Sequence, residues 1–239
     1  MKKLVIIPTY NEIENIEAMI EKVFSLRYDF DLLIVDDGSP DGTAEVVKRN
    51  MMSYKNRLHI VEREGKLGLG SAYINGFRWG LERDYDIIFE MDCDFSHNPN
   101  DLIRLCDAVD KGADVVVGSR YVKGVNVVNW PMSRLLLSYF ASRYVKIITR
   151  MKVNDATAGF VGYRREVLET IDLNNVKMKG YGFQIEMKYS AWRLGFKIEE
   201  VSIIFTDREE GNSKMSGGIF SEALFGVVKL PFRKIRRCK

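Results

Sequence analysis

The sequence predicts an α/β fold in which a mainly parallel, twisted sheet carries helices on both faces. From Leu4 to Gly118, short apolar runs alternate with longer segments of helical periodicity, a pattern typical of βαβ units. The chain has 239 residues, of which 46% are hydrophobic and 29% charged, which suits a large globular domain. It contains no internal repeat, low-complexity tract or Gly/Ser-rich linker. A sheet of this kind binds its ligand at the carboxyl ends of the strands.

Five short apolar runs are expected to form buried strands. They are Leu4–Pro8, Leu32–Val35, Leu58–Val61, Ile87–Met91 and Val115–Gly118. Four segments with helical periodicity lie between or after them, at Glu12–Leu26, Asp41–Arg49, Gly68–Glu82 and Asn100–Lys111. The apolar residues of the first helix fall on one face, and Asp41 can cap the second helix.

The pattern changes after Pro131. Two apolar segments with basic residues follow, at positions 134–150 and 218–237. Such amphipathic helices either pack on a core or lie in a membrane interface, and the sequence leaves both possibilities open. Five cations in the last seven positions form either a solvated chain end or a contact with anionic lipid. We therefore predict a main domain over residues 1–217 and a basic, membrane-associating segment over residues 218–239.

Composition disfavours several classes of protein. The three cysteines are an odd number without metal-ligand spacing, which indicates reduced thiols in a cytoplasmic setting. The apolar run near the N-terminus is too short for a signal peptide, and no stretch approaches the ~18 apolar residues of a transmembrane helix. Nucleic-acid binding is disfavoured because the basic residues are not interleaved with aromatic ones. We expect a peripheral protein on the cytoplasmic face of a membrane.

The strand Ile87–Met91 runs directly into Asp92-Cys93-Asp94. Because strand side chains repeat every second position, the two carboxylates can point the same way. Two hard oxygen donors at the carboxyl edge of a sheet suit Mg²⁺ or Mn²⁺, with phosphate oxygens and water completing the shell. The alternative interpretation of this pattern alone is a solvated acidic turn.

Polar residues also follow the other predicted strands. They include Tyr10 and Glu12 after the first strand, Asp36 and Asp37 after the second, and Arg120 after the last. An aromatic ring can stack on a base, a carboxylate can accept hydrogen bonds from base or ribose, and a metal can bridge a diphosphate. The edge of the predicted sheet is therefore suited to a nucleotide.

Eight motifs carry a family resemblance over nearly the whole chain. They are PTYNE (8–12), VDDGSPDGT (35–43), GKLGLGSAYINGF (65–77), DCDFSHNP (92–99), GSRYV (118–122), DATAGFVGYRREVL (155–168), GYGFQIEM (180–187) and DREEGNSKM (207–215). Together they resemble family 2 glycosyltransferases of the GT-A fold. Within that family they look like the synthases of dolichyl- or polyprenyl-phosphate mannose.

The resemblance implies a set of nucleotide-binding residues. The set consists of Pro8, Tyr10, Glu12, Val35, Asp37, Asp92, Cys93, Asp94, Arg208 and Lys214. Within it, Asp92 and Asp94 would hold the metal and the diphosphate. Relatives often carry a glutamine two residues after the second aspartate, where this chain has Ser96. A third ligand is therefore left open between Ser96, His97 and water.

The resemblance also implies how the acceptor is held. Arg120 and Arg134 would bind an acceptor phosphate, since arginine grips phosphate oxygens bidentately. Asp155 and Gln184 would shape the sugar and acceptor pocket, and residues 207–215 would form a loop that closes over both substrates. The residues expected to carry catalysis are Asp94, Arg120, Arg208 and Lys214.

The implied reaction is metal-dependent transfer of mannose from GDP-mannose to dolichyl or polyprenyl phosphate, with inversion to the β-linked product. The implied cofactor is Mg²⁺ or Mn²⁺, and the implied partners are a membrane surface and possibly a membrane protein. Three alternatives stay open at this point. They are a UDP-glucose-using polyprenyl-phosphate glucosyltransferase, a transferase for surface glycans, and a non-catalytic sugar-nucleotide-binding scaffold.

Overall fold

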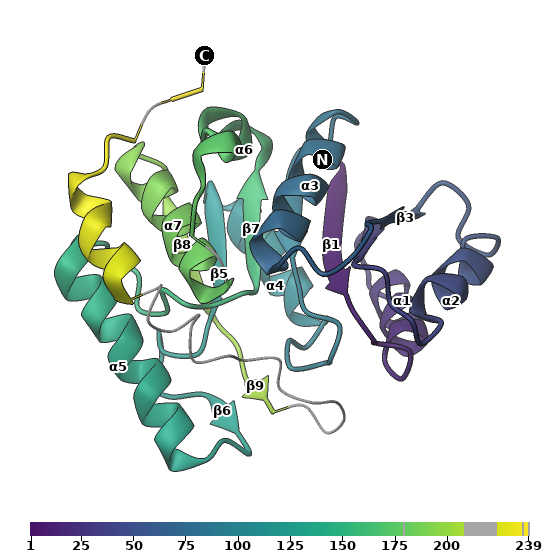
Figure 1. The fold of residues 1–239 in the computed structure, drawn as a ribbon, viewed down its shortest axis with the longest axis horizontal. Helices are drawn as coiled ribbons and strands as arrows, with labels where there is room; N and C mark the ends of the chain where they lie inside the picture. The colour runs from purple at the N-terminus through teal and green to yellow at the C-terminus, as the bar shows by residue number, and fades with distance from the viewer. Residues whose placement is uncertain (179, 208–223, 236, 239) are drawn as a thin grey trace.

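A seven-stranded sheet forms the centre of the computed structural model, which describes residues 1–239 except 179, 208–223, 236 and 239 (Figure 1). The strand order is β3-β2-β1-β4-β7-β5-β8. The strands are β1 (Lys3–Thr9), β2 (Phe30–Asp36), β3 (Leu58–Glu62), β4 (Ile87–Glu90), β5 (Val115–Ser119), β7 (Val161–Arg164) and β8 (Ile198–Ser202). The predicted α/β class is confirmed.

The sheet is parallel except for β7, which runs antiparallel to both of its neighbours, β4 and β5. The sequence analysis predicted neither β7 nor β8. Strand β7 has four residues and contains Gly162, and β8 carries two consecutive glutamates, so neither is a continuous apolar run. Gly162 is required there, because a Cβ at this position would approach the Phe89 ring to 2.5 Å.

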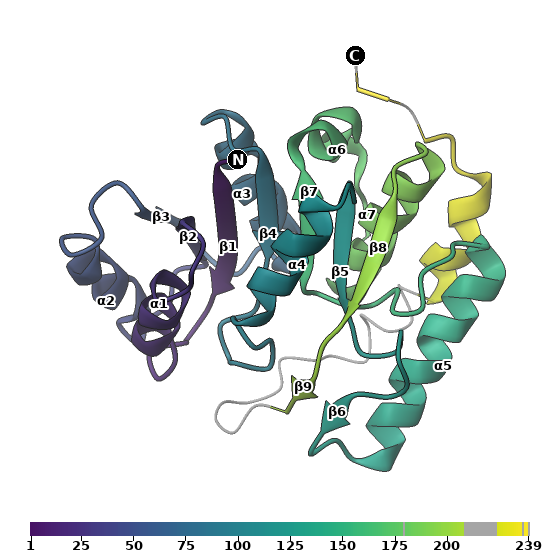
Figure 2. The same cartoon turned by 180° about the vertical axis from the view of Figure 1, so that it is seen from behind.

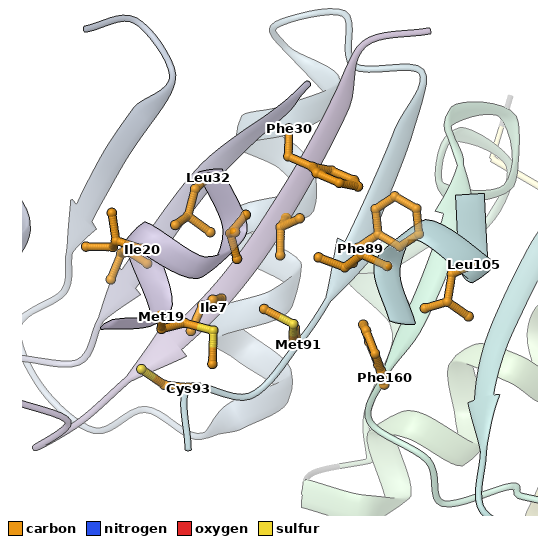
Figure 3. Close-up of a cluster of buried hydrophobic side chains, with 14 of the residues drawn as sticks. Ile7, Met19, Ile20, Phe30, Leu32, Phe89, Met91, Cys93, Leu105 and Phe160 are labelled. Atoms are coloured by element: carbon orange, nitrogen blue, oxygen red, sulfur yellow. The ribbon is translucent and has the colours of Figure 1, made fainter. Parts of the chain in front are cut away.

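Helices cover both faces of the sheet, as predicted (Figure 1, Figure 2). One face carries α1 (Ile16–Phe24), α2 (Thr43–Asn50) and α4 (Asp101–Asp110), whose buried residues form the apolar cluster of Figure 3 with one side of the strands. The other face carries α3 (Leu69–Leu81), α6 (Arg165–Thr170) and α7 (Gly180–Arg193), which share a second cluster. The N-cap of α2 is Gly42 rather than the predicted Asp41, which lies one residue earlier and accepts a hydrogen bond from the Thr43 amide at 3.0 Å.

The long helix α5 (Met132–Thr149) lies beside the C-terminal segment along one side of the molecule (Figure 1, Figure 2). Residues 224–229 are helical and lead into the 3₁₀ turn η2 (Leu230–Phe232). Val227 and Leu230 are buried against α5 and α7 in a third apolar cluster. The inner side of the predicted amphipathic segments therefore packs on the core, while their outer side stays exposed.

The described residues near the basic chain end contact the body of the protein at several points. Arg233 pairs with the buried carboxylate of Glu186 on α7. Arg237 forms an antiparallel bridge with Ile171, and the Cys238 amide donates to the Thr170 carbonyl at 2.8 Å. Two further short elements pair below the sheet, β6 (Val127–Val128) with β9 (Phe205–Thr206), and the 3₁₀ turn η1 (Leu173–Asn175) precedes α7.

Strand β1 lies between β2 and β4, although the chain reaches β2 first and β4 much later. The chain therefore runs from β1 through β2 to β3 on one side of β1, and then crosses back to form β4 on the other side. A crevice opens at the carboxyl ends of the strands at such a switch point, and ligands bind there. Thr9–Glu12 and Asp92–Asp94 both follow these strand ends.

Candidate active site

Asp92 and Asp94 follow β4 and continue its alternation. Met91 and Cys93 point into the apolar cluster on the α1/α4 face (Figure 3). Asp92 lies on the opposite side, where its charge together with burial raises the pKa of the Tyr73 hydroxyl on α3. The Asp92 side chain is 40% exposed, and Asp94 accepts a hydrogen bond from the Ser96 amide at 3.1 Å. The pattern thus places both carboxylates at the sheet edge with the intervening cysteine turned inward.

His97 is a buried neighbour of this carboxylate pair rather than an exposed turn residue. Its Nδ1 accepts the amide proton of Asp92 at 3.2 Å, and its ring packs against Phe160 and Phe205. Burial lowers its pKa, so the imidazole is neutral. Ser96 is 3% exposed. Among the described residues, no group of three His, Cys, Asp or Glu side chains is arranged to hold a metal.

The loops after β1 and β2 are joined by hydrogen bonds that centre on Asp36. Its carboxylate accepts from the Thr9 hydroxyl at 2.8 Å and from the Ser39 amide at 2.8 Å. The Ser39 hydroxyl in turn accepts the amide of Asn11 at 3.0 Å. Asp36 therefore fixes the shape of the loop that carries Tyr10.

Two of the predicted nucleoside-binding residues already have cationic neighbours. Asp37 pairs with Arg63 at 2.5 Å, and both side chains are nearly buried. The Lys66 ammonium lies 5.0 Å from the centroid of the Tyr10 ring, within the range of a cation–π contact. Glu12 donates its amide to the Thr43 hydroxyl at 3.0 Å.

Three other residues predicted to bind the nucleotide are buried or half-buried. Val35 is fully buried in the core, and Cys93 is 3% exposed. Pro8 is half-buried within β1, opposite Val35 in the strand register. Ligand contacts by these three residues therefore stay predictions. Arg208 and Lys214 lie outside the described residues.

Arg120 follows β5 and forms a buried ion pair with Asp155. The guanidinium donates from Nε and Nη2 to the two carboxylate oxygens at 2.7 and 2.6 Å, and Nη2 also donates to the Thr157 hydroxyl. Burial alone would raise the pKa of Asp155, but the charge and hydrogen bonds of Arg120 lower it below its usual value. Both groups are therefore ionised, and the pair is rigid.

Arg134, on α5, forms a more exposed ion pair with Asp207. Its Nη1 donates to both carboxylate oxygens at 2.7 and 2.8 Å, and the two side chains are 33% and 25% exposed. The Trp130 ring lies between the two arginines, 5.4 Å from the Arg120 guanidinium and 4.3 Å from that of Arg134. Sequence reasoning missed Asp207 as the partner of Arg134.

An apolar groove with a volume of about 300 Å³ has these two arginines in its lining, and Arg134 is the first of the α5 residues that line it. Its walls come from α5, α7 and the C-terminal segment, and its lining includes Leu137, Phe140, Tyr144, Ile185, Leu224 and Val227. The arginine end of the groove is close to Asp92 and Asp94. The centroid of the Phe205 ring lies 5.4 Å from that of the His97 ring and 5.6 Å from the Arg120 guanidinium. The apolar groove, the two arginines and the carboxylates of Asp92 and Asp94 therefore lie next to one another at the sheet edge.

A buried polar network lies beneath the site. Gln184 on α7 donates to Glu90 at 2.6 Å, and the Lys188 ammonium donates to the Ala158 carbonyl at 2.7 Å. Burial raises the pKa of Glu90 and lowers that of Lys188. Sequence reasoning named Gln184 but missed the two charged residues. A glutamate inside an otherwise apolar strand was the available signal.

This chain belongs to glycosyltransferase family 2. The family model described as "Glycosyl transferase family 2" matches residues 4–172, a span that includes all of β1 except Lys3, both acidic residues after β4, and Asp155. The family membership expected from the sequence motifs is confirmed.

Similar proteins narrow the resemblance further. The chain is 49% identical to "Polyprenol monophosphomannose synthase" of Mycolicibacterium smegmatis, over 97% of this chain and 88% of that protein. It is 47% identical to "Undecaprenyl-phosphate mannosyltransferase" of Micrococcus luteus, over 96% and 93% respectively. It is 36% identical to "Dolichol-phosphate mannosyltransferase" of Pyrococcus furiosus, over 96% of this chain and 64% of that protein.

Solved structures support the fold. Glucosyl-3-phosphoglycerate synthase from Mycobacterium tuberculosis, in complex with phosphoglyceric acid, matches with a TM-score of 0.68 at 19% identity, over 98% of this chain and 81% of that one. The same enzyme in complex with Mn²⁺, UDP-glucose and glycerol 3-phosphate matches with a TM-score of 0.64 at 21% identity, over 95% and 79%. At this identity the similarity concerns the fold alone.

Proposed function

We propose that this protein transfers mannose from GDP-mannose to the phosphate of a polyprenol or dolichol, giving polyprenyl phosphate β-mannose. The names of three relatives support the sugar and the lipid phosphate acceptor. GDP as the nucleotide rests on the resemblance of the sequence motifs.

The observation that carries the proposal is the groove that ends at Arg120 and Arg134. A long isoprenoid needs an apolar channel, and its phosphate needs cations at one end of that channel. The groove meets both needs, and its cationic end adjoins Asp92 through His97 and Phe205.

The acidic pair fits a divalent cation. Asp92 and Asp94 are hard oxygen donors at the sheet edge, and a third ligand would come from Ser96, His97 or water. This donor set suits Mg²⁺ or Mn²⁺ that is also held by substrate phosphates. When bound, the metal would neutralise charge on the departing nucleoside diphosphate. Mn²⁺ with UDP-glucose in a neighbour of the same fold supports such a metal.

The side chains of the site have electrostatic and positional roles in this proposal. A phosphate monoester has a second pKa of about 6, so the acceptor is anionic near neutral pH and attacks without a strong general base. Arg120 and Arg134 orient it toward the anomeric carbon, where a new carbon–oxygen bond forms as the bond to GDP breaks. A single displacement inverts that centre. We further propose that Arg208 and Lys214 bind the diphosphate.

An exposed apolar surface next to the groove supports a peripheral membrane position. It comprises Leu136, Leu137, Phe140 and Ile147 of α5 with Leu224, Phe225, Val228 and Phe232. Arg143, Lys146, Lys229 and Lys234 are on the same two segments, and such cations favour anionic lipid. Leu137, Phe140 and Leu224 belong to both the surface and the groove, so a lipid can pass from one to the other. Among the described residues, no helix has the length and apolarity needed to cross a bilayer.

We propose that this surface, which includes part of residues 218–239, binds the cytoplasmic face of the membrane directly or together with a membrane protein. Because Val227 and Leu230 belong to the core, deleting the whole segment would also unfold its surroundings. Point substitutions at exposed positions are therefore the cleaner test of membrane binding.

An assay with purified protein tests the proposed reaction. GDP-mannose and UDP-glucose are compared as donors, with Mg²⁺ or Mn²⁺ and a short polyprenyl phosphate as acceptor. We expect a lipid-linked mannose product from GDP-mannose, its loss in excess chelator, and a decrease of at least about a hundredfold in Asp94→Asn. Asp110→Asn, at an exposed carboxylate on α4, is the matched control and should retain full activity. Product from UDP-glucose alone would instead indicate a glucosyltransferase.

A further inference from the structure

The two arginines at the end of the groove differ in how firmly their carboxylate partners are held. The side chains of Arg120 and Asp155 are 7% and 0% exposed, and Asp155 also accepts the Arg120 amide at 2.9 Å. The side chains of Arg134 and Asp207 are 33% and 25% exposed. Removing one partner of a buried pair is strongly destabilising, whereas a partly exposed pair contributes little to stability. The carboxylate on Arg134 can therefore be exchanged, and the one on Arg120 cannot.

We propose that Asp207 is an exchangeable counter-ion that occupies Arg134 in the free enzyme and that the acceptor phosphate displaces. This inference rests on the proposed function, because it requires a phosphate acceptor in the groove. It adds to that function a residue, Asp207, that lowers the affinity of the enzyme for its acceptor.

The geometry allows the exchange without movement of the backbone. The Asp207 amide donates to the Val128 carbonyl at 3.1 Å, and the Phe205 amide donates to the Asn126 carbonyl at 3.0 Å. These bonds hold the end of β9 against β6. Rotation of the partly exposed Asp207 side chain would release Arg134 while this backbone stays in place.

Exchange also explains how the product leaves. The acceptor is a phosphate monoester with a charge near −2, and transfer of the sugar converts it into a phosphodiester with a single charge. The attraction to Arg134 falls at the moment of reaction, while the competition from Asp207 stays the same. The carboxylate can then return to Arg134, and the product is released toward the membrane.

Asp207→Asn tests this inference because it keeps the shape of the side chain and removes its charge. We expect tighter binding of both farnesyl phosphate and its mannosyl phosphodiester, each by about two- to fivefold, since the competing pair contributes at most about 1 kcal/mol. The readouts are the KM for farnesyl phosphate and the inhibition constant of the product. Glu62→Gln, which removes a charge from the distant Lys48–Glu62 pair, should change neither.

A double-mutant cycle with Arg134→Met identifies the site of action. In that background, Asp207→Asn should no longer tighten phosphate binding. If Asp207→Asn tightened phosphate binding equally in the Arg134→Met background, the effect would come from the general electrostatic field of Asp207. The proposed exchange would then be wrong. Weaker binding in Asp207→Asn alone would mean that Asp207 positions Arg134, which also overturns it. If the wild-type protein makes no lipid-linked product at all, the proposed function fails first, and that outcome is distinct from both.

Discussion

Asp155→Asn removes the negative charge from the buried ion pair with Arg120 and leaves the guanidinium in place. Arg120 is 6% exposed and Asp155 is fully buried. The carboxylate accepts three hydrogen bonds from Arg120, at 2.6, 2.7 and 2.9 Å. An amide in its place has one acceptor oxygen and turns an NH₂ group toward the other donors. We expect the free energy of unfolding to fall by about 3–5 kcal/mol, because a buried cation loses its counter-charge.

Urea unfolding followed by tryptophan fluorescence measures this change. With an m-value of about 3 kcal/mol/M, the midpoint should move down by about 1–1.7 M. Glu62→Gln is the control, since both side chains of the Lys48–Glu62 pair are 47% exposed and such pairs contribute about 0–1 kcal/mol. Equal midpoint shifts in the two variants would refute the reasoning.

A double variant separates stability from activity. Arg120→Met combined with Asp155→Leu leaves no charge of this pair in the core, and replacement of a buried pair by apolar residues is often neutral for stability. We expect this variant to regain most of the stability that Asp155→Asn loses, but to lack transferase activity. Activity at the wild-type level would show that Arg120 has no part in binding the acceptor.

Three further predictions concern packing, pH and the membrane. Gly162→Ala should destabilise the fold by about 1–3 kcal/mol in urea unfolding, because its Cβ would lie 2.5 Å from Phe89 and 2.8 Å from Val116; an unchanged midpoint would contradict the packing. Burial lowers the pKa of His59, so the unfolded state binds more protons below pH ~6.5 and the free energy of unfolding falls on acidification. The fall in this free energy between pH ~7 and ~5.5 should be smaller in His59→Gln than in the wild type. An equal fall in the two proteins would contradict the role of His59. Phe140→Ser with Phe225→Ser should reduce sedimentation with anionic vesicles at least about tenfold, whereas Met52→Ser, at an exposed position elsewhere, should not; equal binding by both proteins would exclude this surface.

The acidic pair could be predicted from the sequence because its signals are local. An apolar run identifies the strand, and alternation places Asp92 and Asp94 on one side of it. Arg120 was predicted from the GSRYV motif that contains it, and Arg134 from the positive charge of the segment at 134–150. Their carboxylate partners had no local signal, because Asp207 lies 73 residues after Arg134 and Asp155 lies 35 residues after Arg120. Contacts of this range depend on the strand order, which periodicity does not determine.

The strand order itself was only partly predictable. Parallel neighbours follow from the βαβ alternation between β1 and β5. Strand β7 enters the sheet between β4 and β5 in the opposite direction, and four residues with a central glycine give a weak strand signal. The C-terminal segment was predicted as one helix over 218–237, whereas the helix of residues 224–229 gives way to a 3₁₀ turn at Pro231. Proline disfavours helical geometry at the residue before it.

The chain end provides a position at which the protein can be labelled. Of the three thiols, Cys93 and Cys106 are buried, and Cys238 is exposed. Its backbone is fixed to Thr170 at the end of α6, across the molecule from β6 and β9 (Figure 1). A maleimide dye would therefore label the unmodified protein at a single position remote from the acidic pair. Fluorescence quenching by labelled lipids could then report the orientation of the protein on a vesicle without any engineered cysteine.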